Sequence, residues 1–410
     1  MSQTIGDYLH MPSPLKEAMM KALNPRHLLS LLVVIAAALF ALPAAAMADD
    51  GSDDDRDRDR GSRGAVFVQT NEADGNRILA YRRAPNGTLR EPLSYSTGGL
   101  GTGLTRTSSQ GPVVLSEDGD RLFTVNQASN DISVFDVHGR RLTLLQRIAS
   151  GGVRPFSITQ HDEIVYVLNN GNVADGPEGV ANINGYRLDD GRLEQLPDST
   201  RELTQAGTDP AQVGFTPNGR SLVVTEKETN RLDTFDVGRR GYATDPRVHA
   251  SAGMTPFGFD FTRDGTFVVT EAAGGEIGKA TASSYRIGGP RGLRTLSGAV
   301  PDFRSEVCWT AITNNDRFAY ITNFGDGTIS SYRIADDGTI TLHESIAAVT
   351  TLDQLSIRDA GFSEDGRYLY AIDIASQKVH AWEVDQRHGD LTPIGAFPGL
   401  PGTVAGLAAT

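Results

Sequence analysis

The sequence predicts an all-β fold, a seven-bladed β-propeller built from four-stranded antiparallel blades. One unit of strand, tight turn and strand recurs along the chain, and helical patterns are scarce among 410 residues that include 45 glycines. The two ends of the repeat region also hold complementary parts of one unit. A ring closed in this way leaves no unpaired sheet edge, which favours a propeller over a pair of β-sandwiches.

The composition excludes several classes of function. A net charge of −13 argues against a nucleic-acid partner, because phosphate contacts require basic patches. The single cysteine, Cys308, excludes an internal disulfide, a multi-thiolate metal site and a c-type haem. The histidines lack metal-binding spacing, and the chain has neither a phosphate-binding loop nor a G-x-S-x-G motif. We therefore expect no metal and no cofactor.

Residues 1–48 have the order of a secretory signal peptide. Basic residues precede an apolar run from Leu28 to Leu42, and Ala46-Met47-Ala48 suits a signal peptidase. The run is short for a bilayer span, although a retained anchor is the alternative. We expect a secreted or periplasmic chain that begins at Asp49 and is free of the membrane after cleavage. Met20 is an alternative start to Met1.

Residues 49–64 read DDGSDDDRDRDRGSRG and contain no large apolar side chain to bury. Such a composition predicts a disordered linker. Its alternating aspartates resemble a calcium loop, but Arg60 stands where the loop glycine belongs and the distal glutamate is missing. The propeller is therefore expected over residues 65–410.

The repeated unit joins antiparallel strands through Asp-Gly or Asn-Gly turns, which suit backbone of positive φ. Seven units over residues 65–410 average about 49 residues, close to the ~40–50 of a propeller blade. Six of the units open at Val113, Phe156, Val213, Phe257, Trp309 and Asp359.

The ends of the repeat region predict how the ring closes. The first unit begins at Ala65 with a second strand and lacks the inner one, whereas the chain ends on a lone strand. We expect residues 402–410 to supply the missing inner strand beside Ala65.

Several stretches resemble a known family. Tyr-Ile-Thr-Asn at 320–323 and Tyr-Val-Leu-Asn at 166–169 resemble YVTN-type propeller repeats. Residues 65–410 resemble the seven-bladed lactonase family, which contains propeller-type 6-phosphogluconolactonases and carboxymuconate-cyclising enzymes. The matching stretches are GVRP at 152–155, FTPNGR at 215–220 and FSEDGRYL at 362–369. The resemblance implies a small-molecule lactone as substrate.

One departure from the family pattern concerns the substrate. In the enzymes a Gly-Pro-Arg-His stretch opens an inner strand, and its Arg and His are associated with the active site. This chain has Asp-Pro-Ala-Gln there, so Ala211 and Gln212 replace the basic pair. The resemblance therefore implies lactone chemistry without favouring a phosphorylated sugar.

Polar residues end the second strand of most units, near the central channel that is the default ligand site of a propeller. Glu226 and Glu271 end consecutive units in matching Val-Val-Thr-Glu contexts. If they face each other, repulsion would raise one pKa toward that of a general base. The alternative is that these residues cap strand ends. The set comprises Asn126, Asn169, Glu226, Glu271, Asn323 and Asp373.

Residues that open inner strands form a second candidate set. Arg154 precedes Pro155 and would stabilise a developing oxyanion, unless it forms an ion pair between blades. Arg358 has the equivalent position in the seventh unit, and Trp309 and Gln212 are candidates for lining the pocket. Cys308 has no histidine nearby in sequence and is expected to be buried as a small apolar residue.

Three functional hypotheses follow. The first is a monomeric secreted enzyme that hydrolyses or forms a lactone without a metal, with Glu226 or Glu271 as base and Arg154 on the carbonyl oxygen. The second is a non-catalytic platform that binds a ligand or protein, with Gly-rich insertions at 171–181 and 272–281 forming its surface. The third is a structural protein of a surface coat.

Overall fold

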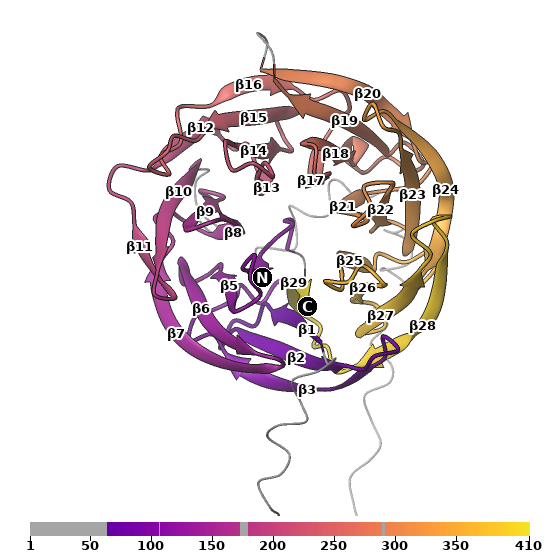
Figure 1. Ribbon diagram of the computed structural model, residues 1–410, viewed down its shortest axis with the longest axis horizontal. Helices are drawn as coiled ribbons and strands as arrows, with labels where there is room; N and C mark the ends of the chain where they lie inside the picture. Colours follow the sequence, from indigo (N-terminus) through magenta and orange to yellow (C-terminus); the bar gives the residue numbers. More distant parts are fainter. Residues whose placement is uncertain (1–63, 106, 173–178, 289–291) are drawn as a thin grey trace, which may run out of the picture. The chain divides into compact units, whose positions relative to one another are not determined.

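Seven β-sheets surround a central axis in the computed structural model, which describes residues 64–105, 107–172, 179–288 and 292–410 (Figure 1). The predicted seven-bladed propeller is confirmed. The signal peptide and almost all of the linker predicted for residues 1–64 lie outside the described residues. No helix within the described ranges has the length and apolar character needed to cross a membrane.

Each blade is an antiparallel meander that starts at the channel and ends at the rim. The innermost strands of blades 1 to 7 are β29 (Val404–Ala409), β4 (Val113–Leu115), β8 (Pro155–His161), β13 (Pro210–Phe215), β17 (Pro256–Phe261), β21 (Val307–Ile312) and β25 (Ile357–Phe362). The second strands are β1 (Ala65–Thr70), β5 (Arg121–Asn126), β9 (Ile164–Asn169), β14 (Ser221–Glu226), β18 (Thr266–Glu271), β22 (Phe318–Asn323) and β26 (Tyr368–Asp373).

The outer half of each blade faces the rim. The third strands are β2 (Arg77–Arg83), β6 (Asp131–His138), β10 (Val180–Asp189), β15 (Arg231–Asp236), β19 (Thr281–Ile287), β23 (Thr328–Ile334) and β27 (Lys378–Val384). The outermost strands are β3 (Leu89–Ser96), β7 (Arg141–Ala149), β16 (Arg247–Ala250), β20 (Leu293–Pro301), β24 (Ile340–Val349) and β28 (Leu391–Pro398), with β11 (Arg192–Gln195) and β12 (Arg201–Ala206) sharing this place in blade 3. A short 3₁₀ helix, η2 (Ala273–Gly275), follows β18.

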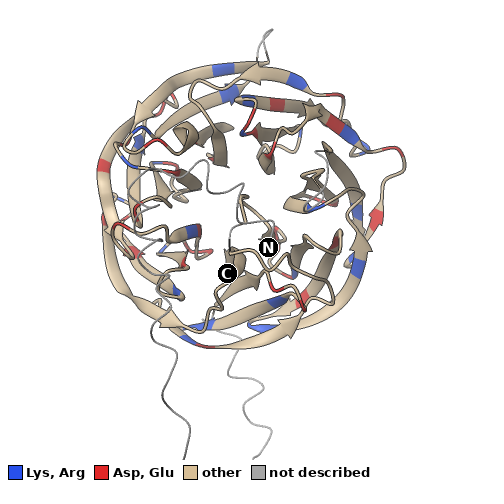
Figure 2. Cartoon of the chain, turned by 180° about the vertical axis from the view of Figure 1, so that it is seen from behind, with Lys and Arg blue, Asp and Glu red and all other residues tan. Residues whose placement is uncertain are grey.

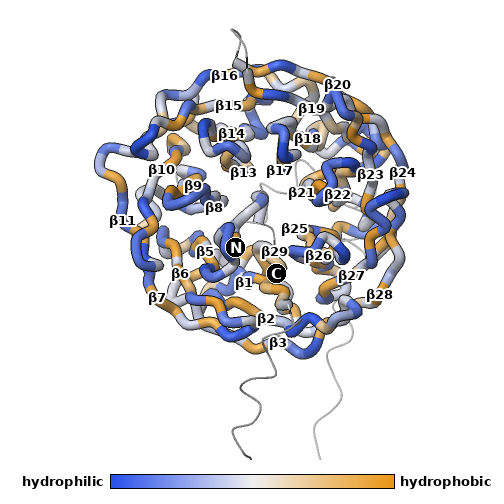
Figure 3. The backbone as a smooth tube through the Cα atoms, in the orientation of Figure 1, coloured by the Kyte–Doolittle hydropathy of each residue, from blue (hydrophilic) through white to orange (hydrophobic). Residues whose placement is uncertain are grey.

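The core lies between the blades. Second strands such as β9 and β14 are buried along their whole length because both faces of each sheet pack against neighbouring sheets. The tube in Figure 3 shows apolar and polar segments alternating within the blades, and Figure 2 shows both signs of charge around the whole ring.

Tyrosines of the second strands join three of the blades to the next blade. The hydroxyls of Tyr166, Tyr320 and Tyr370 donate to the carbonyls of Gly241, Gly389 and Gly87, each in an outer turn of the following blade, at 2.8–2.9 Å. A buried hydroxyl needs such a partner, so the tyrosine both fills the core and fixes blade spacing.

The C-terminal strand closes the ring as predicted. β29 pairs antiparallel with β1, with Val68 opposite Leu407. The amide of Thr410 donates to the carbonyl of Ala65 at 3.0 Å, and the amide of Ala65 donates to the Thr410 hydroxyl at 2.7 Å. The first blade is thus assembled from both ends of the repeat region.

Candidate functional site

A left-handed residue precedes the inner strand in four consecutive blades. Arg154, Asp209, Thr255 and Glu306 have φ values of 59°, 43°, 59° and 50°. Such conformations are uncommon outside glycine and cost energy that surrounding contacts must offset. In two of these blades an asparagine of the preceding blade accepts the amide of the left-handed residue: Asn130 for Arg154 and Asn230 for Thr255.

The segment Thr107–Gln110, which leads into β4, crosses the channel. Thr107 donates to the carbonyls of Val404 and Ala405 in blade 1. On the opposite side, the Gln110 amide donates to the carbonyl of Ala211 in blade 4 and its side chain to the carbonyl of Thr310 in blade 6. The segment therefore divides the channel and forms the floor of a cavity at the end where inner strands begin.

This cavity has a volume of about 550 Å³ and is open to solvent. Blades 4 to 7 and the crossing segment contribute its walls. The lining residues are Thr107, Ser108, Asp209, Lys227, Glu228, Asn230, Met254, Thr255, Phe257, Ala272, Gly274, Gly275, Glu306, Cys308, Trp309, Phe324 and Arg358.

Lys227 and Asp209 form an ion pair in the cavity wall. The Lys227 side chain is only 6% exposed, its Nζ lies 3.0 Å from Asp209 Oδ2, and it donates to the carbonyl of Ser108 at 2.8 Å. Asp209 also accepts from the side-chain amide of Asn170 at 2.9 Å. A buried ammonium needs such partners to stay charged, so this arrangement holds a cation against the crossing segment.

A second cation, Arg358, approaches the same segment from blade 7. It is almost fully buried, donates to the carbonyl and hydroxyl of Thr107 at 3.2 Å, and stacks over Phe324 at 5.4 Å. Glu306 stands at the start of β21 and faces Gly275, where a Cβ would lie 3.2 Å from Glu306 Oε1. A carboxylate and two cations thus share one partly enclosed space.

Aromatic side chains supply the apolar wall between the charged groups. Phe257 and Trp309 pack edge to face with ring centroids 5.3 Å apart, and the Trp309 indole N–H donates to the carbonyl of Ser109 at 2.9 Å. Lys227 Nζ lies 5.0 Å from the Phe257 ring centroid, a favourable cation–π distance. The cavity can therefore hold a molecule with both polar and apolar parts.

Comparison with known proteins assigns this chain to a family. The family model described as "Lactonase, 7-bladed beta-propeller" matches residues 61–172 and 293–408, more than half of the chain. The chain belongs to this family. The family resemblance seen in the sequence is confirmed.

Two curated relatives of this lactonase-family propeller are 6-phosphogluconolactonases. The protein from Pectobacterium carotovorum is 26% identical over 45% of this chain and 54% of its own, and that from Yersinia enterocolitica is 24% identical over 46% and 57%. The chain thus spans about half the length of the curated relatives it matches. The solved structure of a periplasmic gluconolactonase from Pseudomonas aeruginosa, with 16% identity and a TM-score of 0.64 over 85% of this chain and 99% of its own, shares the fold.

The structure places Glu226 inside its blade. Its carboxylate is fully buried and accepts from the hydroxyls of Thr204 and Thr229. The neighbouring carboxyl is Asp233 on the adjacent strand rather than Glu271, and burial together with Glu226 raises the pKa of Asp233 to about 8. Glu226 is not among the residues that line the cavity.

Glu271 is likewise fully buried and surrounded by donors. It accepts from the amide of Gly253 at 2.8 Å and from the hydroxyls of Ser283 and Thr281 at 2.6 and 2.5 Å. These bonds join the second and third strands of blade 5 to the loop before β17. They match the strand-capping alternative and give the proposed catalytic role of the two glutamates no geometric support.

The other polar residues at second-strand ends also bond to neighbouring strands and turns. Asn126 donates to Ser133, Asn323 donates to Ser330, and Asp373 accepts from Ser376, in each case between neighbouring strands or their turn. Asn169 donates to the carbonyl of Ser150 and to Asn182. All four side chains are fully buried, and none lines the cavity.

Among residues that open inner strands, the structure brings Trp309 and Arg358 into the cavity. Arg154 lies beside it, with its guanidinium 5.2 Å from the Phe156 ring centroid. Burial lowers the pKa of Arg154, and the charge of Asp209 opposes that shift. Arg154 is not a lining residue, so the structure separates it from Arg358.

Gln212 has a structural role at the position where the resemblance to the family enzymes implies a histidine. Its side chain accepts the Phe259 amide at 2.7 Å and donates to the Phe259 carbonyl at 3.0 Å, which joins β13 to β17. Ala211 packs with Phe257 and Trp309 in an apolar cluster. Neither position supplies a charge, and the cations among the described lining residues are Lys227 and Arg358.

Sequence reasoning missed Asp209, Lys227, Glu306 and the crossing segment. The sequence held a signal for Asp209 and Glu306, because each of them occupies in its unit the position that Arg154 occupies in its own unit. Lys227 directly follows a predicted second strand, one residue beyond Glu226. The crossing segment had no such signal, since nothing local indicates that residues 107–110 leave the rim and enter the channel.

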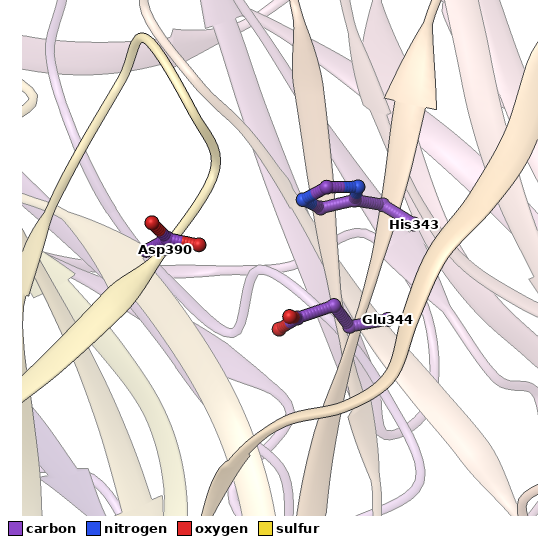
Figure 4. Close-up of side chains that lie close together, drawn as sticks. All are labelled: His343, Glu344 and Asp390. Atoms are coloured by element: carbon purple, nitrogen blue, oxygen red, sulfur yellow. The ribbon is translucent and has the colours of Figure 1, made fainter.

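One group of potential metal ligands lies at the rim, away from the cavity lining. His343, Glu344 and Asp390 offer ligand atoms that all lie within 4.8 Å of one another, and Figure 4 shows the first two pointing toward Asp390. A β-bulge in β24 explains this, because adjacent residues there project to the same side. Glu344 and Asp390 are exposed, and such groups are common without an ion, so we assign no metal.

Proposed function

We propose that this propeller hydrolyses a small-molecule lactone, or closes one in the reverse direction, inside the channel-mouth cavity. The observation that carries the proposal is the gathering of Glu306, Lys227 and Arg358 around one cavity in a chain of the lactonase family. The relatives named as 6-phosphogluconolactonases support lactone chemistry.

The proposed steps use only side chains of the cavity. Glu306 accepts a proton from water as that water adds to the carbonyl carbon of the lactone. The carbonyl oxygen becomes an oxyanion, which Arg358 and Lys227 stabilise by charge and hydrogen bonding. The ring C–O bond then breaks, and the proton held by Glu306 passes to the leaving alkoxide. The product is a hydroxy acid, whose ionisation releases one proton.

The test is proton release from a panel of γ-, δ- and aryl-lactones by the wild-type protein and the variant Glu306→Gln. We expect the variant to lose about 10²–10⁴-fold in kcat/KM, the usual contribution of a general base, with an unchanged melting temperature. The matched control is Glu276→Gln, an exposed glutamate that does not line the cavity. Equal activity of Glu306→Gln and wild type would refute the proposed base.

The same panel addresses the role predicted for Glu226 and Glu271. If either were the base, its glutamine variant would lose turnover while keeping its melting temperature. Their buried contacts favour the opposite result, a lowered melting temperature. Absence of turnover by the wild type on every lactone would favour the platform that binds a ligand without catalysis.

We propose that the reaction needs no metal, because Glu306 can act as base and the two cations can stabilise the oxyanion. Turnover that persists after dialysis against EDTA would support this. Activity lost with EDTA and restored by a divalent cation would contradict it.

We also propose export through residues 1–48, on the order of basic, apolar and small residues described above. Mass spectrometry of protein recovered from the periplasm and the medium would then give an N-terminus at Asp49. A chain that keeps residues 20–48 and fractionates with membranes would indicate an anchor instead.

A further inference from the structure

Three large apolar side chains stand exposed beside the cavity. Met254 lines it and is 58% exposed, while Ile277 and Phe303 are 82% and 61% exposed. Ile277 lies two residues from the lining residue Gly275, and Phe303 lies three residues from Glu306. The amide of Gly278 donates to the hydroxyl of Ser305 at 3.1 Å, so the two loops that carry Ile277 and Phe303 are in contact.

These residues continue the apolar character of the lining onto the adjacent loops. Phe257 and Trp309 line the cavity and are buried, Met254 lines it and is exposed, and Ile277 and Phe303 are exposed on the two loops that carry Gly275 and Glu306. Exposed apolar groups of this size are costly in water unless something covers them. Apolar side chains are therefore present both in the cavity lining and on the exposed loops next to it.

The charges of the described lining residues disfavour an anionic ligand. Among the described lining residues, three carboxylates (Asp209, Glu228 and Glu306) stand against two cations. Lys227 already bonds Asp209 and the Ser108 carbonyl, and Arg358 already bonds Thr107. A phosphate group would have to draw these cations away from their partners.

We propose, on the basis of the function above, that the substrate is an uncharged lactone bearing an aliphatic chain. The lactone ring lies among Glu306, Lys227 and Arg358, and the chain runs past Met254 toward Ile277 and Phe303. The cavity, at about 550 Å³, is much larger than a five-membered lactone ring and leaves room for a chain of several carbons.

The first measurement compares kcat/KM for γ-butyrolactone, γ-hexalactone, γ-octalactone and γ-decalactone with that for 6-phosphogluconolactone. We expect kcat/KM to rise roughly two- to fourfold for each methylene that the wall covers. The phosphorylated lactone should be the poorest substrate. The double variant Ile277→Ser/Phe303→Ser should flatten the rise with chain length. The matched control, Val248→Ser, alters an exposed residue on outer strand β16 and should keep the wild-type rise.

A binding measurement separates this inference from the proposed catalysis. Calorimetric titration uses the corresponding γ-lactams, from 2-pyrrolidinone to its 5-hexyl derivative, which resist hydrolysis. Tighter binding of the longer lactams with no lactone turnover would support the ligand class and refute the catalytic function. Turnover without dependence on chain length, or a preference for the phosphorylated lactone, would refute the ligand class alone. Absence of both binding and turnover would refute both.

Discussion

Three glutamates of this propeller show how the surroundings of a carboxylate decide what it can do. Glu226 and Glu271 are fully buried and bonded to several hydroxyl donors, which occupy the carboxylate oxygens and leave little access for water. Glu306 stands half-buried in a cavity wall. Only a carboxylate that lines a cavity, as Glu306 does, can lie close to a substrate and accept a proton from the attacking water.

Glu271→Gln should therefore destabilise the fold. The amide nitrogen of glutamine would face donors, so at least one of the bonds from Gly253, Ser283 or Thr281 is lost inside the blade. We expect a loss of about 2–4 kcal/mol in the free energy of unfolding, measured by urea denaturation, since each buried donor or acceptor left without a partner costs about 1–3 kcal/mol. An unchanged midpoint would show that the carboxylate is not structural.

Lys227→Met should weaken both stability and turnover. The substitution leaves Asp209 without its cation and removes the donor to the Ser108 carbonyl. We expect a loss of about 1–3 kcal/mol in stability and a fall in kcat for lactone hydrolysis. The control Lys279→Met changes an exposed lysine on the neighbouring loop and should match the wild type in urea unfolding and in activity.

Inner strands are joined to one another by side chains rather than by sheet hydrogen bonds. Ser157 of β8 accepts the amide of Val213 in β13, Asp260 of β17 accepts that of Ile312 in β21, and Asp359 of β25 accepts that of Leu407 in β29. Neighbouring blades splay apart around the axis, so their inner strands belong to separate sheets. These polar side chains span the gaps and satisfy amides that would otherwise be buried without partners.

Asp359 makes one of these junctions dependent on pH. Burial raises its pKa to about 8, so the folded protein keeps a proton that the unfolded chain releases near pH 4. Below about pH 4 the neutral carboxyl makes its full contribution to the free energy of unfolding. That contribution declines as the pH rises toward 8, by at most about 1.4 kcal/mol per pH unit.

Asp359→Asn cannot ionise and keeps an acceptor for Leu407. Between pH 5 and pH 8 we expect the wild type to lose about 1–3 kcal/mol more stability than this variant. Urea unfolding at both pH values gives the comparison, in which the other titrating groups cancel. Parallel pH dependence of the two proteins would mean that Asp359 is not protonated in the fold.

At the scale of the whole molecule, closure depends on the last strand of the chain. β29 supplies the inner strand of blade 1, and its residues Val404 and Leu407 are buried in the core shared by blades 1 and 7. Without it, β1 would expose a free edge beside an opened channel.

Deletion of residues 403–410 should abolish cooperative unfolding and cause aggregation through the exposed edge of β1. Leu407→Ala, a milder change, should cost about 2–4 kcal/mol because it leaves a cavity at a 5% exposed position. Leu93→Ala, on the exposed outer strand β3, is the control. Thermal unfolding followed by circular dichroism measures all three, and a truncated chain that melts like the wild type would refute the closure argument.

The sequence by itself determined the architecture, because the features that specify it are local or repeated. Asp-Gly or Asn-Gly turns recur at the same place in four of the units, where Gly119, Gly219, Gly265 and Gly366 have the positive φ that such turns need. The number of units gave the number of blades. The unpaired strands at both ends predicted the closing pair.

Only the tertiary structure decided which side chains form the cavity. Thr107 and Arg358 are 251 residues apart and meet because the crossing segment reaches blade 7. Whether a polar residue at a strand end turns into the channel or between strands depends on sheet register and blade packing, which no local pattern encodes. Of the residues singled out from the sequence, Trp309 and Arg358 line the cavity, whereas Glu226 and Glu271 were given a role that their buried positions do not favour.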